Sequence, residues 1–153
     1  MRKTMKTNMK QAISNVLELM FFISIQFKEE DGPPGGWSPR DQASIMATLG
    51  FSGPVSGSYY LLIPVAMAKE ITANFLGLGE EEVSTAQERD TVKEALNMIG
   101  GHMLSLADQP DGYQLGIPEI VSGADPNAYT GENDNTIYFE AGEHCMAAGV
   151  VLN

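Results

Sequence analysis

The chain has 153 residues, 43% of them apolar and 19% charged, a composition typical of a compact soluble domain rather than a disordered chain. Its 20 acidic residues outnumber the 9 basic ones and give a formal net charge of -11. That charge repels phosphate backbones and anionic lipid surfaces, so it argues against nucleic acid or membranes as partners. We expect one domain over residues 1–153.

The N-terminal segment predicts a long amphipathic helix with one inward apolar stripe. The stripe comprises Met5, Met9, Ile13, Val16, Met20, Ile23 and Phe27. Lysines precede it as in a signal peptide, but Glu18 interrupts it and no small-residue cleavage site follows, so we interpret it as structural. No apolar run approaches the roughly 18 residues of a membrane span. The glycine and proline cluster at 31–36 then ends the helix.

The middle of the chain predicts a hairpin followed by two helices. Aromatic and branched residues fill two short runs that a Ser-Gly-Pro turn separates. Pro64 ends the second run, and glycines close the short helix after it. The expected elements are strands over 43–51 and 57–64 and helices over 66–76 and 84–106.

The last third of the chain predicts three strands, over 113–121, 136–140 and 143–152. The polar segment 123–135 offers oxygen ligands at alternating positions, as calcium loops do. An EF-hand loop needs glycine at position six and glutamate at position twelve. Counted from Asp125 as position one, Gly131 falls at position seven and Thr136 at position twelve. We therefore interpret this segment as a solvated hairpin loop. The elements together predict an α+β fold, with long helices packed on one face of a largely antiparallel sheet.

The helix over 84–106 has two opposite faces at about 100° per residue. Its apolar face comprises Val92, Leu96, Ile99, Met103 and Leu106. Its polar face comprises Asp90, Glu94, Asn97 and Gly101. Every helix needs a polar outer face, but asparagine is a mediocre helix former, and a glycine costs about 1 kcal/mol relative to alanine. These costs favour a functional surface, because a glycine lets another protein's backbone approach closely.

At these residues the chain resembles the active-site helix of the CheC, CheX and FliY chemotaxis phosphatases. The shared pattern is Asp-x-x-x-Glu-x-x-Asn, which runs from Asp90 to Asn97 and is followed by an apolar pair and a glycine. Residues 56–64 and the helix after them are similar to the family's corresponding segment, and 116–123 resemble its Leu-Pro-x-Val-Val-x-Gly stretch. The resemblance covers most of the chain and implies a CheC/CheX-like single domain.

The single cysteine, Cys145, excludes an internal disulfide and fits a reducing cytoplasm. The resemblance implies a phosphatase that hydrolyses the aspartyl phosphate of a CheY-like chemotaxis response regulator. Asn97 would position the attacking water, and Glu94 would pair with a lysine in the partner's active site. Asp90 and Gly101 would be docking contacts. No cofactor or metal of its own is expected, because the Mg²⁺ would belong to the partner's receiver domain. A homodimer through edge strands is also implied.

A second copy of the motif on the first helix is incomplete. Ser14 and Glu18 stand at the right spacing, but Phe21 occupies the place of the asparagine. This favours the single-site CheX type over the two-site CheC type. Structural roles are expected for both histidines, His102 and His144, and the lone cysteine is expected to be buried in the last strand.

Two other functions stay open at this point. A CheX-like module that binds a receiver domain or assembles a signalling complex without catalysis would carry the same helix. A ligand-binding sensory domain would need an enclosed apolar pocket, which the sequence does not reveal.

Overall fold

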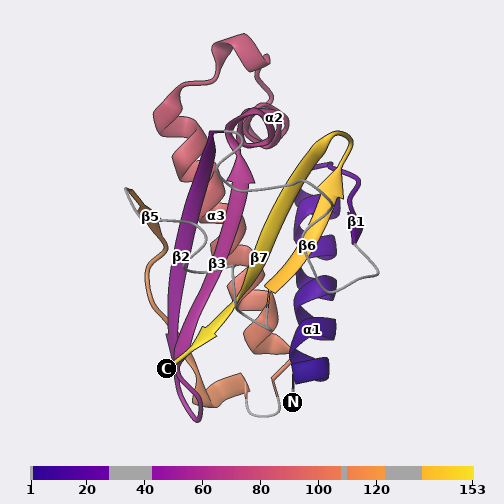
Figure 1. Ribbon diagram of the computed structural model, residues 1–153. Coiled ribbons are helices and arrows are strands. Elements are labelled where there is room, and N and C mark those ends of the chain that lie inside the picture. Colours follow the sequence, from indigo (N-terminus) through magenta and orange to yellow (C-terminus); the bar gives the residue numbers. More distant parts are fainter. Residues whose placement is uncertain (1, 28–42, 108–109, 123–135) are drawn as a thin grey trace.

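The computed structural model describes residues 2–27, 43–107, 110–122 and 136–153. Helices α1 and α3 lie side by side behind the sheet in Figure 1, and α2 lies at the upper end. The helical elements are α1 (Arg2–Ser14), η1 (Asn15–Met20), α2 (Val65–Leu76), η2 (Glu80–Glu82), α3 (Thr85–Ser105) and η3 (Pro110–Gly112). The strands are β1 (Gln26–Phe27), β2 (Ser44–Ser52), β3 (Gly57–Pro64), β4 (Gln114–Leu115), β5 (Glu119–Val121), β6 (Thr136–Ala141) and β7 (His144–Leu152).

The strands form one seven-stranded sheet in the order β1-β6-β7-β3-β2-β4, and β5 also pairs with β2. Neighbouring strands pair in antiparallel fashion. The expected hairpin forms between β2 and β3, with the register running from Ser44↔Pro64 to Phe51↔Gly57. The predicted α+β class and largely antiparallel sheet are therefore confirmed.

The strands bury side chains on both faces of the sheet. Alternation along β2 turns Ala47 and Leu49 toward the main core with α1 and α3. The intervening Met46 lies on the other face in a smaller buried cluster with Tyr60, Leu62 and Ala147. The side chains of β3 alternate in the same way, which places the helices against one face only.

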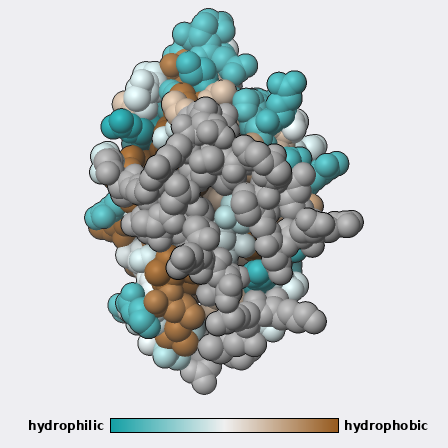
Figure 2. Space-filling model, in the orientation of Figure 1, coloured by the Kyte–Doolittle hydropathy of each residue, from teal (hydrophilic) through white to brown (hydrophobic). Residues whose placement is uncertain are grey.

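The surface over the α2–α3 connection is strongly hydrophilic. This connection forms the top of the molecule, where Figure 2 shows a hydrophilic cap. The exposed run Glu80–Glu82 lies there as the short helix η2. Among the described helices, none is long and apolar enough to cross a membrane.

The prediction of a single helix through Phe27 was wrong. The α-helix ends at Ser14 and continues as the π-helix η1, and Gln26–Phe27 is a strand. A π-helix bonds each residue to the fifth one along, so it rotates the later side chains off the 3.6-residue stripe. Met20, expected in the core, is consequently 46% exposed.

The strand expected over 113–121 is also interrupted. It forms two short strands, β4 and β5, which both pair with β2. Between them the Gly116 N–H donates to the Gly50 carbonyl oxygen at 2.8 Å, and Pro118 has no N–H to add to the ladder. The hairpin loop expected over 123–135 lies outside the described residues.

Candidate functional site on the exposed face of α3

Helix α3 starts from a capping box that fixes its first turn. The Ser84 hydroxyl accepts the N–H of Gln87 at 3.1 Å, and the Gln87 side chain accepts the N–H of Ser84 at 2.9 Å. This reciprocal pair satisfies two backbone donors that the helix itself cannot satisfy. Predicted core residues Val92, Leu96, Ile99 and Met103 are all buried, so the opposite face is turned outward.

Two adjacent glycines show how closely α3 packs on the sheet. A Cβ atom on Gly100 would lie 2.5 Å from Leu49 Cδ2, so any larger residue here would require the buried Leu49 side chain to shift. A Cβ atom on Gly101 would meet nothing within 4 Å. Packing therefore explains Gly100 but leaves Gly101 without a structural reason within the described part of the chain.

The structure brings the four predicted site residues together on this outer face. Asp90, Glu94 and Gly101 are exposed, and Asn97 is half-buried. Asp90 forms an ion pair with Lys93 at 3.5 Å, a solvated contact of little energetic weight. Among the described residues, no hydrogen bond or ion pair engages the side chain of Glu94 or Asn97. A carboxylate and an amide, one helical turn apart, are thus available to another molecule.

A hollow of about 390 Å³ lies directly beside the carboxylates. It separates the end of α2 from the first half of α3 and combines apolar and acidic walls. Its lining residues are Phe75, Leu76, Gln87, Asp90, Thr91 and Glu94. Such a site suits a partner side chain with an apolar stem and a positive charge.

Exposed apolar residues also lie at the end of the first helix, which contacts α2 through Phe21. Phe21 contacts Phe75 with ring centroids 4.9 Å apart. Near Phe21, Leu19 is 70% exposed and Phe22 is 72% exposed. Phe22 also has a φ of 59°, in the left-handed region that bulky residues rarely adopt. These three exposed residues, Leu19, Met20 and Phe22, form what we call the η1 apolar patch.

Sequence reasoning missed the η1 apolar patch because it extended the helical stripe through Met20 to Phe27. The signal that could have found it is the pair Phe21-Phe22. Adjacent helical positions lie about 100° apart, so two neighbouring phenylalanines do not share a narrow buried stripe. On a helix with a single narrow apolar stripe, one of the two is expected to face outward.

The incomplete second motif is engaged in internal contacts. The Ser14 hydroxyl donates to the Glu18 carboxylate within the same helix. Phe21, at the position of the missing asparagine, is fully buried. No amide therefore stands beside Glu18 at this position.

The remaining candidate groups lie apart from the α3 face. His102 Nε2 lies 3.3 Å from the Asn15 amide nitrogen and links α3 to the first helix. Cys145 is buried in β7, as predicted, and His144 is half-buried beside it. In the part of the chain that the structure describes, no group of three His, Cys, Asp or Glu side chains could hold a metal ion.

Comparison with known proteins identifies relatives of this chain. The family model described as "Chemotaxis phosphatase CheX" matches residues 45–140. This range includes all of β3, α2 and α3, and all of β2 except its first residue. A comparison with curated proteins found no match.

Solved structures share the fold at low sequence identity. The chemotaxis protein CheX of Vibrio vulnificus matches with a TM-score of 0.76 and 17% identity, over 100% of this chain and 99% of that one. A chemotactic CheC-like protein of Shewanella oneidensis gives 0.68 and 19%, over 100% of both chains. A chain in the CheX-CheY-BeF₃-Mg²⁺ complex of Borrelia burgdorferi gives 0.68 and 16%, over 96% of each chain. At these identities the likeness establishes the fold.

Proposed function

The chain belongs to the CheX family of chemotaxis phosphatases, and from this premise we propose that it hydrolyses the aspartyl phosphate of a CheY-like response regulator. The observation that carries the proposal is the placement of Glu94 and Asn97, one turn apart on an exposed helix face, with no described partners. We take residues 1–153 as one domain with this activity.

The proposed reaction does not require a covalent intermediate on this protein. The water oxygen bonds to phosphorus as the bond from phosphorus to the aspartyl oxygen breaks, which releases the carboxylate and inorganic phosphate. Such a transfer depends on placing water in line and on neutralising phosphoryl charge. The Asn97 amide can both accept from and donate to a water, and α3 is a rigid element on which to hold it.

Glu94 is proposed to set the docking register. A lysine in the partner's active site would form a charge-assisted bond with this exposed carboxylate. Asp90 and Gly101 would contact the partner on either side, because they extend the same face by a turn in each direction. The bare surface at Gly101 supports this role, since no described neighbour requires a glycine there.

The solved complex from Borrelia burgdorferi supports a receiver domain as the partner. That structure contains a chain similar to this one together with CheY, BeF₃ and Mg²⁺. We propose that Mg²⁺ reaches this site with the phosphorylated receiver, in the acidic pocket that carries the phosphoaspartate. The metal would neutralise phosphoryl charge, and residues of α3 would supply the positioned water.

The homodimer implied by the resemblance stays a prediction. It would use an edge of the sheet, where the outermost described strands on the main path are β1 and β4. Analytical ultracentrifugation at micromolar concentration would measure the mass directly.

The experiment that tests the proposed function is the decay of phosphate on a cognate receiver domain. The protein is added at a tenth of the receiver concentration, so that each molecule must act repeatedly. Faster decay of the whole phosphorylated pool would support an enzyme. Binding without acceleration would instead support a module that docks receivers without catalysis.

A further inference from the structure

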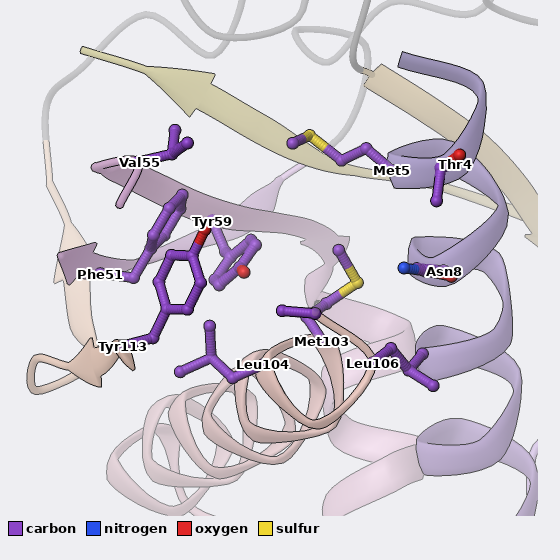
Figure 3. A pocket seen from close by; sticks show the side chains of 11 residues that line it. Thr4, Met5, Asn8, Phe51, Val55, Tyr59, Met103, Leu104, Leu106 and Tyr113 are labelled. Carbon is purple, nitrogen blue, oxygen red and sulfur yellow. The ribbon is translucent and has the colours of Figure 1, made fainter. Parts of the chain in front are cut away.

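A second hollow lies at the opposite end of α3, between the first helix and the β2–β3 turn (Figure 3). Its volume is about 180 Å³, somewhat larger than cavities of roughly 150 Å³ that hold benzene in other proteins. Its lining residues are Thr4, Met5, Asn8, Phe51, Val55, Tyr59, Met103, Leu104, Leu106, Ala107 and Tyr113. None of these carries a charge, so the hollow suits a neutral molecule.

One buried hydroxyl in this hollow has no described partner. Tyr59 is 4% exposed, and Figure 3 shows its ring reaching into the hollow between Phe51 and Met103. No described group forms a hydrogen bond with its hydroxyl. Burial, together with the nearby Tyr113, raises the pKa of Tyr59 to about 12, so the hydroxyl keeps its proton and can donate. A buried donor without an acceptor is costly, and a bound molecule would satisfy it.

A second polar group faces the same space from the other side. The Asn8 side chain points from α1 toward Met103 in Figure 3. This amide is half-buried, and no hydrogen bond to it occurs among the described residues. The two methionines Met5 and Met103 lie between the polar groups and provide adaptable apolar walls. A mostly apolar hollow with a few convergent polar groups is the usual character of a small-molecule site.

We propose that this hollow binds a small neutral molecule about the size of a substituted benzene ring, whose oxygen accepts a hydrogen bond from the Tyr59 hydroxyl. The site is distinct from the α3 motif. Met103 lies six residues beyond Asn97, which is about 9 Å along the helix axis. The inference does not depend on the proposed phosphatase activity.

The test uses two probes of nearly the same shape. Acetophenone carries a carbonyl oxygen, and α-methylstyrene has a CH₂ group in its place. Each is titrated into protein labelled with ¹³C on the methionine methyl groups. We expect saturable shifts of the Met5 and Met103 methyl signals, and none of Met46, which lies on the other face of the sheet.

Two variants distinguish the contribution of the Tyr59 hydroxyl to binding from that of the apolar walls. Tyr59→Phe should weaken acetophenone binding by up to about tenfold, the range for one hydrogen bond, and leave α-methylstyrene binding unchanged. Val55→Phe should fill the hollow from the turn and abolish the shifts with both probes. Dispersed methyl signals would show that each variant is folded. Absence of saturable shifts at Met5 and Met103 in the unaltered protein would overturn the proposal, as would equal loss of both probes in Tyr59→Phe.

Discussion

Phe21 packs against Phe75 with ring centroids 4.9 Å apart, at the place where a second copy of the α3 motif would need an asparagine. The Asn74 side chain also donates to the Phe21 carbonyl oxygen at 3.0 Å. These contacts fix the end of the first helix against α2, next to the hollow that borders Glu94. Phe21, which stands in place of the asparagine of a second motif, therefore also helps to fix the wall of the hollow beside Glu94.

Restoring that asparagine should cost stability and add no second site. Phe21→Asn removes a fully buried ring and leaves a polar amide in its cavity, so the free energy of unfolding should fall by about 3–5 kcal/mol. Phe21→Leu, which keeps an apolar side chain, should lose less. Urea denaturation measures both changes. A stable Phe21→Asn variant with faster phosphatase turnover would contradict this interpretation.

The two glycines of α3 should respond in opposite ways to alanine. Gly101→Ala should raise the free energy of unfolding by up to about 1 kcal/mol, because its Cβ meets nothing and alanine favours a helix. The same change should weaken binding to the phosphorylated receiver. Gly100→Ala should bring no such gain, because Leu49 would have to move. Thermal melting and receiver titration distinguish the pair, and unchanged receiver binding by Gly101→Ala would remove Gly101 from the docking surface.

Neutralising Glu94 should impair docking more than chemistry. Glu94→Gln removes the charge from a proposed bond to lysine, so the KM for the phosphorylated receiver should rise by about tenfold or more. The matched change Asp90→Asn should have a smaller effect, because Asp90 is largely exposed and already pairs with Lys93. Initial rates over a range of receiver concentrations give kcat and KM separately. A fall in kcat alone would contradict a docking role for Glu94.

The buried tyrosine Tyr59 predicts a loss of stability at high pH. Burial raises its pKa from 10.0 to about 12, so the unfolded chain loses this proton before the folded chain does. The stabilising contribution is complete below pH 10 and disappears as the pH rises from 10 to 12, by at most about 2–3 kcal/mol. Urea denaturation at pH 9, 10 and 11 should show a shallower decline in Tyr59→Phe. An equal decline in both proteins would contradict the assignment.

Much of the fold could be predicted because periodicity reports burial directly. The apolar stripe of α3 and the β2–β3 hairpin were expected at nearly the bounds observed. The end of the first helix could not be predicted in this way. Its π-helix and the left-handed Phe22 result from tertiary packing, including the contact between Phe21 and Phe75, which lie far apart in sequence.

The helix face that carries the candidate site could be predicted from the sequence, but the two hollows could not. Residues Asp90 to Gly101 belong to one helix, so their common face follows from local geometry alone. The hollow beside Glu94 needs Phe75 and Leu76 from another helix. The second hollow joins side chains from the first helix, the β2–β3 hairpin and the C-terminal end of α3. Spaces of that kind depend on how elements pack, which a single sequence does not specify.

The most direct test of the central proposal compares the intact protein with Asn97→Ala in the decay of receiver phosphate. We expect the acceleration to fall by about 10²–10³-fold, as when one positioned polar group is removed from an active site, with receiver binding and the melting temperature nearly unchanged. Asn15→Ala is the matched control, because it removes an amide from the neighbouring helix that contacts His102 instead. Full acceleration by Asn97→Ala would contradict the assignment of Asn97 as the residue that positions the water.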